Sequence, residues 1–158
     1  SNKIIQDGEI VSFDTDMVGP YGYCADISRA FVVGNKFNDE QKKLYSMAVE
    51  QIDYNSRLIK DGLSFKEFTD KSWVLPEDYY PNRYSVMVHG IGLCDEWPAI
   101  RYPTDGGERS GMFQKNMTIT VESYIGKVGG KEGVKLEQQY LIGENGLELM
   151  SHHPLEDI

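Results

Sequence analysis

The chain has 158 residues, of which 40% are hydrophobic and 26% are charged, and this composition fits one globular domain with a sizeable core. Its formal net charge of -9 argues against a nucleic-acid surface, which would normally be basic, and against an anionic membrane surface. Because no apolar run approaches the length of a membrane span, we expect neither nucleic acid nor membrane among its partners.

The first predicted element is a β-hairpin with strands at residues 9–18 and 23–33, joined by a Gly-Pro-Tyr-Gly turn. Asp14 and Asp16 are two residues apart, so they point to the same face of a strand. With this turn as the loop, Asp16 lies opposite Asp26, and the repulsion among the three acids favours a bound divalent metal ion. The alternative is a polar face in water, but the apolar residues on both flanks predict strands that are largely buried.

Two helices are predicted next. Apolar residues recur at helical spacing over residues 39–60, and Asn38 with Gln41 forms a capping-box pattern at the start. Ser64 begins a shorter predicted helix, which reaches residue 73 before the chain meets a proline.

The rest of the chain predicts strands separated by glycine-rich and proline-rich loops. The strands are expected at residues 84–93, 118–125, 134–142 and 147–151. The order of hairpin, two helices, strand, loop and hairpin predicts an α+β fold with a mostly antiparallel sheet and helices on one side.

A second pair of acids is expected in the late hairpin. If residues 126–133 close the loop, Glu122 lies directly opposite Glu137. Like charges in this position destabilise a sheet unless a cation lies between them, although either glutamate alone would be interpreted as a surface acid.

His89 lies in the apolar sequence Val-Met-Val-His-Gly-Ile-Gly-Leu, where a histidine is commonly a core residue. The glycines Gly90 and Gly92 instead indicate close approach of another group to the backbone, and imidazole is a common metal ligand. Five carboxylates and one histidine therefore form a candidate ligand set for two divalent ions.

Two cysteines, Cys24 and Cys94, are too few for a disulfide framework. Both lie beside acids assigned to the site, so we expect free thiols in a reducing compartment, the cytoplasm.

Five motifs in this order resemble the pita-bread metallopeptidases, which include methionine aminopeptidase, aminopeptidase P, prolidase and, without metal, creatinase. They are Asp-Thr-Asp, the later Ala-Asp-Ile-Ser-Arg, His-Gly-Ile-Gly-Leu, Thr-Val-Glu and Lys-Leu-Glu-Gln-Gln. The resemblance implies the C-terminal part of a pita-bread fold. It also implies a dinuclear metal site, whose five ligands would be Asp16, Asp26, His89, Glu122 and Glu137.

Two departures from the peptidases are informative. The peptidases space their two aspartates one residue further apart than Asp16 and Asp26, and Asp14 is an additional acid here. Their second histidine after His-Gly-x-Gly-Leu is replaced by Asp95. A carboxylate at neutral pH cannot donate a hydrogen bond to a peptide carbonyl, so peptidase activity is disfavoured.

Both departures resemble one branch, the DddP-type dimethylsulfoniopropionate lyases. This resemblance implies cleavage to dimethyl sulfide and acrylate, with Asp14 as a metal ligand, Asp95 as the base and iron as the metal. Carboxylate and imidazole ligands also suit manganese, cobalt or zinc. A cationic carboxylate substrate would favour an aromatic wall, for which Tyr84, also suggested by the resemblance, and Trp97 are candidates unless they pack in the core.

Two alternatives stay open: a dinuclear-metal Xaa-Pro dipeptidase or aminopeptidase, and a non-catalytic pseudo-peptidase binding module. The complete ligand set counts against the binding module. The family's catalytic domain is a pseudo-symmetric repeat, so we expect residues 1–158 to be an incomplete metal-binding catalytic domain that lacks the first half-repeat and any N-terminal domain. A homodimer partner, or a separate chain or fragment, would then cover the apolar surface left by that half.

Overall fold

The computed structural model describes residues 2–34, 36–107 and 109–156. An antiparallel hairpin begins the fold and is followed by two helices and a larger antiparallel sheet. The hairpin strands are β1 (Ile10–Asp14), β2 (Met17–Val18), β3 (Cys24–Ala25) and β4 (Ser28–Val32), with β1 paired to β4 and β2 to β3. The helices are α1 (Asp39–Leu58) and α2 (Phe65–Lys71).

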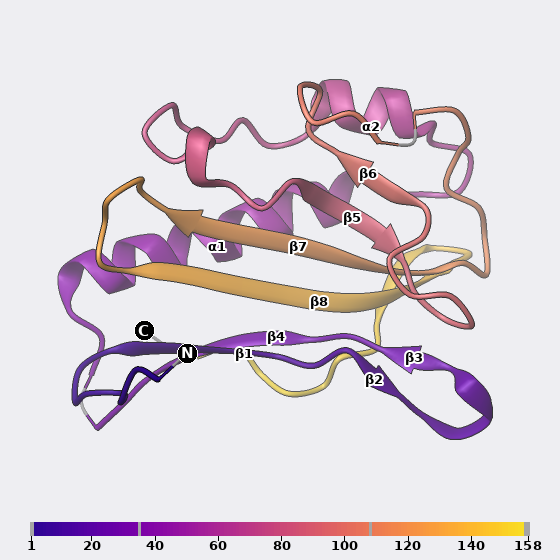
Figure 1. The fold of residues 1–158 in the computed structure, drawn as a ribbon. Coiled ribbons are helices and arrows are strands. Elements are labelled where there is room, and N and C mark those ends of the chain that lie inside the picture. Colours follow the sequence, from indigo (N-terminus) through magenta and orange to yellow (C-terminus); the bar gives the residue numbers. More distant parts are fainter. Residues whose placement is uncertain (1, 35, 108, 157–158) are drawn as a thin grey trace.

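The larger sheet has the strand order β6-β5-β7-β8-β9, and each neighbouring pair is antiparallel. Its strands are β5 (Val86–Gly90), β6 (Ala99–Arg101), β7 (Thr118–Gly126), β8 (Gly133–Gly143) and β9 (Gly146–Leu149). Helix α1 runs along one side of β7 and β8, and α2 lies beyond β6 (Figure 1). The early hairpin lies along β8, and its β2–β3 end extends past the sheet (Figure 1).

Strand periodicity divides the larger sheet into an apolar face and a polar face. Val121 and Leu136 belong to the core that also contains Ile52 of α1. The alternate positions on β7 and β8 carry Glu122 and Glu137, which are paired across the two strands. The acids are therefore buried on the face away from the core, with exposed fractions of only 2% and 1%.

The helix starts follow local rules that the sequence already predicts. The Asn38 side chain accepts from the Gln41 backbone N–H, and the Gln41 side chain accepts from the Asn38 N–H, each at 2.9 Å. The Ser64 hydroxyl accepts from the Glu67 backbone N–H and caps α2. The predicted α+β class, antiparallel sheet and late hairpin register are confirmed.

Two expectations about the strands need correction. Strand β6 was not predicted, because its three residues lie between prolines in a stretch with loop chemistry. The early hairpin is also less buried than its apolar residues suggest, since Phe13 is 61% exposed while Ala30 is fully buried. Residues on one face of this hairpin pack onto the larger sheet, and those on the other face do not. None of the described helices is both long and apolar enough to cross a membrane.

Candidate metal centre

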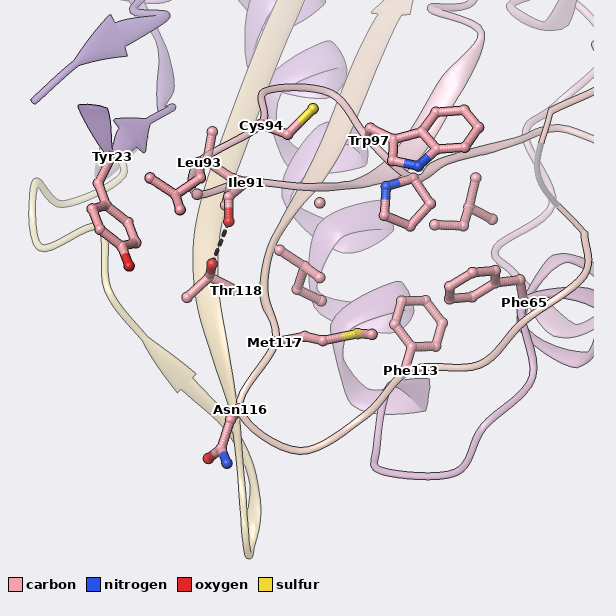
Figure 2. A pocket seen from close by; sticks show the side chains of 15 residues that line it. Tyr23, Phe65, Ile91, Leu93, Cys94, Trp97, Phe113, Asn116, Met117 and Thr118 are labelled. Atoms are coloured by element: carbon pink, nitrogen blue, oxygen red, sulfur yellow. Dashed lines mark hydrogen bonds between the residues drawn. The ribbon is translucent and has the colours of Figure 1, made fainter. Parts of the chain in front are cut away.

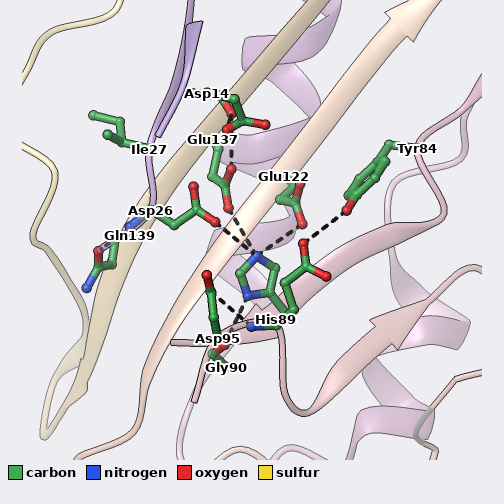
Figure 3. A network of polar contacts seen from close by, with 12 residues as sticks. Asp14, Asp26, Ile27, Tyr84, His89, Gly90, Asp95, Glu122, Glu137 and Gln139 are labelled. Atoms are coloured by element: carbon green, nitrogen blue, oxygen red, sulfur yellow. Dashed lines mark hydrogen bonds and ion pairs between the residues drawn. The ribbon is translucent and has the colours of Figure 1, made fainter. Parts of the chain in front are cut away.

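His89, at the end of β5, stands at the centre of a group of buried acids. Its Nδ1 lies 3.0 Å from the Gly90 carbonyl oxygen, which can only accept, so Nδ1 carries a proton and donates it. The other nitrogen, Nε2, faces Glu137 at 3.2 Å, Glu122 at 3.3 Å and Asp26 at 3.6 Å (Figure 3). When the ring is neutral, Nε2 carries a lone pair that points toward the three carboxylates and can bind a cation; when the ring is protonated, Nε2 donates to Glu137.

These four side chains come from distant parts of the sequence. The β7–β8 register places Glu122 opposite Glu137, and the β5–β7 register places His89 beside Thr120, on the same face. Asp26 belongs to the early hairpin. Its backbone N–H donates to the Gln139 side-chain oxygen of β8 at 3.2 Å, which fixes Asp26 against the larger sheet. All four are at least 97% buried.

The cluster fits a divalent cation. Metal–ligand bonds of about 2.0–2.2 Å place neighbouring ligand atoms about 3.0–3.6 Å apart, which matches the separations around Nε2 of His89. Among the described residues, the buried side-chain oxygens without a hydrogen-bond partner are Thr120 Oγ1 and two carboxylate oxygens of the cluster, Asp26 Oδ1 and Glu122 Oε1. Buried polar atoms are normally satisfied, so these two oxygens indicate a missing cation partner.

The pKa shifts show the repulsion that such a cation would relieve. Burial, then the charges of Glu137 and Asp16, raise the pKa of Asp26 to about 8. Burial and Glu137 raise the pKa of Glu122 to about 7, against the opposing charge of Lys135.

At His89 and Glu137, hydrogen bonding and neighbouring charges shift the pKa in the direction opposite to the effect of burial. Burial alone would lower the pKa of His89, but the hydrogen bond to Glu137 and the charge of Glu122 raise it to about 9. Burial would raise the pKa of Glu137, but the hydrogen bond from His89 and the charge of Lys135 hold it below its ordinary value.

Asp14 and Asp16 lie at the open edge of this cluster. Asp14 accepts a short hydrogen bond from the Ser28 hydroxyl, which is also 3.1 Å from Glu137 Oε2. The hairpin register continues from the Asp14–Ser28 pair to the β2–β3 pairs, which places Asp16 opposite Asp26. Both acids therefore adjoin the buried group, although their residues are exposed.

Asp95 lies on the loop that follows β5, and its carboxylate is next to the acid cluster. Carboxylate oxygens of Asp16, Asp26 and Asp95 all lie within 4.8 Å of one another, and Figure 3 shows Asp95 beside His89. The loop is closed by the Gly90 backbone N–H, which donates to the Pro98 carbonyl at 2.9 Å. The close approach that the glycine predicted is therefore made by the chain's own loop.

The two predicted aromatic contacts lie in different places. Tyr84 adjoins the acids: its hydroxyl donates to Glu96 at 3.4 Å, and the Lys135 ammonium lies 4.9 Å from its ring centre. Burial and the charge of Glu122 raise its pKa to about 12. Trp97 instead lines an apolar cavity of about 390 Å³ on the loop, whose lining includes none of the predicted metal ligands (Figure 2).

Sequence reasoning missed two polar residues that contact the acids directly, Ser28 and Lys135. Arg29 is buried, and its guanidinium donates to the Glu137 backbone carbonyl, to the Gln138 side chain and to the backbone carbonyls of His153 and Pro154. Lys135 could have been found from strand periodicity, because it lies two residues from Glu137 on the same strand. Cys24 and Cys94 are free thiols, as expected.

Residues 1–144 match the metallopeptidase family M24. The chain belongs to this family. It is 39% identical to the dimethylsulfoniopropionate lyase DddP of Roseovarius nubinhibens and 37% identical to that of Roseobacter denitrificans, over 98% of this chain in each case. These alignments cover 35% of each lyase, so the chain spans about a third of the length of these relatives.

The fold of this M24 chain is also that of solved peptidases. The prolidase from Pyrococcus furiosus superposes with a TM-score of 0.80 at 28% identity, covering 98% of this chain and 44% of that one. The Xaa-Pro dipeptidase from Bacillus anthracis gives 0.78 at 28% identity, with coverage of 100% and 43%. The pita-bread fold expected from the motifs is thus confirmed, as is the resemblance to DddP lyases.

Proposed function

We propose that this M24 chain carries the metal centre of a lyase that cleaves dimethylsulfoniopropionate to dimethyl sulfide and acrylate. One observation carries the proposal: the Asp95 carboxylate reaches the acid cluster, within 4.8 Å of Asp16 and Asp26. A carboxylate in this position can accept a proton from a bound substrate but cannot, when ionised, donate to a peptide carbonyl. The identity to two DddP lyases supports the same reaction.

Six residues are proposed to hold two divalent ions. Asp26, His89, Glu122 and Glu137 supply the buried ligands, and Asp14 and Asp16 supply carboxylates at the open edge. We propose iron, while the mixed oxygen and nitrogen ligands also suit manganese, cobalt or zinc. Bound ions would polarise the substrate carboxylate and so acidify the adjacent C–H group.

The proposed reaction needs one base from the chain. Asp95 takes the proton from the carbon next to the substrate carboxylate. The electron pair of that C–H bond forms the new carbon–carbon double bond, while the carbon–sulfur bond breaks and its pair leaves with sulfur. The leaving group is neutral dimethyl sulfide, so no residue needs to protonate it.

Tyr84 is the better supported of the two proposed aromatic contacts for the sulfonium group. It is bonded to Glu96, the neighbour of Asp95, and it is 36% exposed. Its ring already contacts the Lys135 ammonium at 4.9 Å, so a substrate sulfonium would have to share or replace that cation–π contact. Trp97 is 62% exposed and lines the apolar cavity on the loop, whose lining contains none of the proposed metal ligands.

A dinuclear-metal Xaa-Pro peptidase is the second candidate. The 28% identity and TM-score of 0.80 to a prolidase favour it, because the same fold and acids would serve peptide hydrolysis. The choice between the two depends on Asp95. We further propose that the protein acts in the cytoplasm as a homodimer or in complex with a separate chain. The partner would cover the apolar surface that the first half-repeat of the family's catalytic domain would otherwise cover.

The test uses the purified protein in solution. Purified protein is incubated with dimethylsulfoniopropionate or with an Xaa-Pro dipeptide, dimethyl sulfide and released proline are measured, and bound metal is counted by elemental analysis. We expect dimethyl sulfide, and at least a 100-fold slower release in Asp95→Asn at unchanged metal content. The matched control is Asp53→Asn, at an exposed helix position.

Two results would count against the proposal. Release that persists in Asp95→Asn, or in Asp95→His, with metal retained would show that Asp95 is not the base. Release of proline without dimethyl sulfide by the unmodified protein would favour the peptidase.

A further inference from the structure

Lys135 places a cation inside the acid cluster. Its side chain is only 13% exposed, and its ammonium contacts Glu122 closely, Glu137 Oε2 at 3.2 Å and Asp14 Oδ2 at 3.6 Å. These three acids come from β7, β8 and β1, so one ammonium joins the larger sheet to the early hairpin. Neither the lyase step nor the ligand set uses this lysine.

The two glutamates divide their oxygens between Lys135 and His89. Oε1 of Glu122 and Oε1 of Glu137 face His89 Nε2, whereas Oε2 of each glutamate faces the Lys135 ammonium. The lysine therefore contacts the oxygens directed away from the imidazole. It can remain in place while a divalent ion binds the oxygens on the His89 side.

We propose that Lys135 is a fixed counter-cation and a positioning residue of the metal centre. It holds Glu122 and Glu137 so that one oxygen of each faces His89 whether or not divalent ions are bound. The inference rests on the proposed metal centre but not on which reaction that centre catalyses.

Charge compensation explains why such a cation is needed. Two carboxylates directly opposite each other in a sheet repel, and burial prevents water from screening them. Divalent ions would supply the compensating charge when bound, but without them the strand-anchored ammonium on one side and the His89 imidazole on the other are the groups that face both acids. Loss of Lys135 should therefore harm the metal-free protein more than the metal-loaded protein.

The experiment measures thermal unfolding midpoints of the full-length protein in excess EDTA and in saturating Co²⁺. Four proteins are compared: unmodified, Lys135→Met, Lys135→Arg and the control Lys115→Met, whose lysine forms an exposed ion pair with Glu144. For Lys135→Met we expect the midpoint gained on adding Co²⁺ to exceed that of the unmodified protein by at least about 3 °C. Arginine, which keeps the charge, should restore most of this difference, and Lys115→Met should not change it.

The outcomes separate this inference from the metal centre itself. If Co²⁺ stabilises the unmodified protein and Lys135→Met by the same amount, the counter-cation role is wrong although the metal centre stands. If Co²⁺ does not stabilise the unmodified protein, both proposals fail. If Lys135→Met does not fold in EDTA, the milder Lys135→Gln is measured in the same two conditions and judged by the same 3 °C criterion.

Discussion

Replacing Asp26 by asparagine should stabilise the metal-free protein at alkaline pH while destroying its response to metal. The pKa of Asp26 is raised from 3.8 to about 8, by burial first and then by the charges of Glu137, Asp16 and Asp14. A folded-state pKa above the unfolded one means that this group stabilises the fold at pH values below 3.8, and that the contribution is lost as pH rises to about 8.

The size of the effect follows from the same shift. Each tenfold change in proton affinity corresponds to about 1.4 kcal/mol, so ionising Asp26 at pH 8.5 costs the metal-free fold at most about 6 kcal/mol. The repulsion is shared with neighbouring acids, and we expect Asp26→Asn to recover about half, or about 3 kcal/mol. Glu122 and His89 also have raised pKa values, of about 7 and about 9, and act in the same direction.

The assay is thermal unfolding of the full-length protein, followed by circular dichroism between pH 5 and pH 8.5. In EDTA the unmodified protein should lose stability as pH rises, and Asp26→Asn should lose less. With Co²⁺ the unmodified protein should show the opposite trend, because metal ligands must be deprotonated to bind, and the variant should show no gain. Equal stability of the unmodified protein at pH 5 and pH 8.5 in EDTA, or no stabilisation by the substitution, would refute the reasoning.

Two further substitutions test the supports of the site. In Gly90→Ala the added Cβ would lie 2.2 Å from the Trp97 carbonyl oxygen, so the loop carrying Asp95 must shift, and dimethyl sulfide release measured by gas chromatography should fall at least about tenfold. An unchanged rate would show that this loop position is not needed. Ser28→Ala removes the hydroxyl beside Asp14 and Glu137 and should weaken Co²⁺ affinity about tenfold in a titration. The control Ser46→Ala, at an exposed position, should leave the affinity unchanged. A Ser28→Ala variant that binds Co²⁺ as tightly as the unmodified protein would contradict the role given to Ser28.

Much of the candidate site follows from local pattern. The position of the glycine-rich loop fixes the register of the late hairpin, and the structure pairs Glu122 with Glu137 as expected. The same logic places Asp16 opposite Asp26 across the early hairpin. Such pairings depend on turns a few residues long, so the sequence carries the information within one short stretch.

Other features depend on contacts between distant segments. The different surroundings of Tyr84 and Trp97 and the three-residue strand β6 have no local signature in the sequence, and Gly90 indicates a close approach without indicating which segment makes it. Packing of this kind is set by which surfaces meet, and single residues in a loop do not encode it.

The sequence by itself determined the family resemblance, the registers of the two hairpins and the acids that lie opposite one another in them, because turns and side-chain alternation act over a few residues. Only the tertiary structure decided that the early hairpin lies along β8, so that Asp26 meets His89 and Lys135 reaches acids on three strands. The physical reason is that burying like charges together requires a compensating cation from elsewhere in the fold. Lys135 shares strand β8 with Glu137, but the acids of the early hairpin reach it only through packing between segments more than a hundred residues apart.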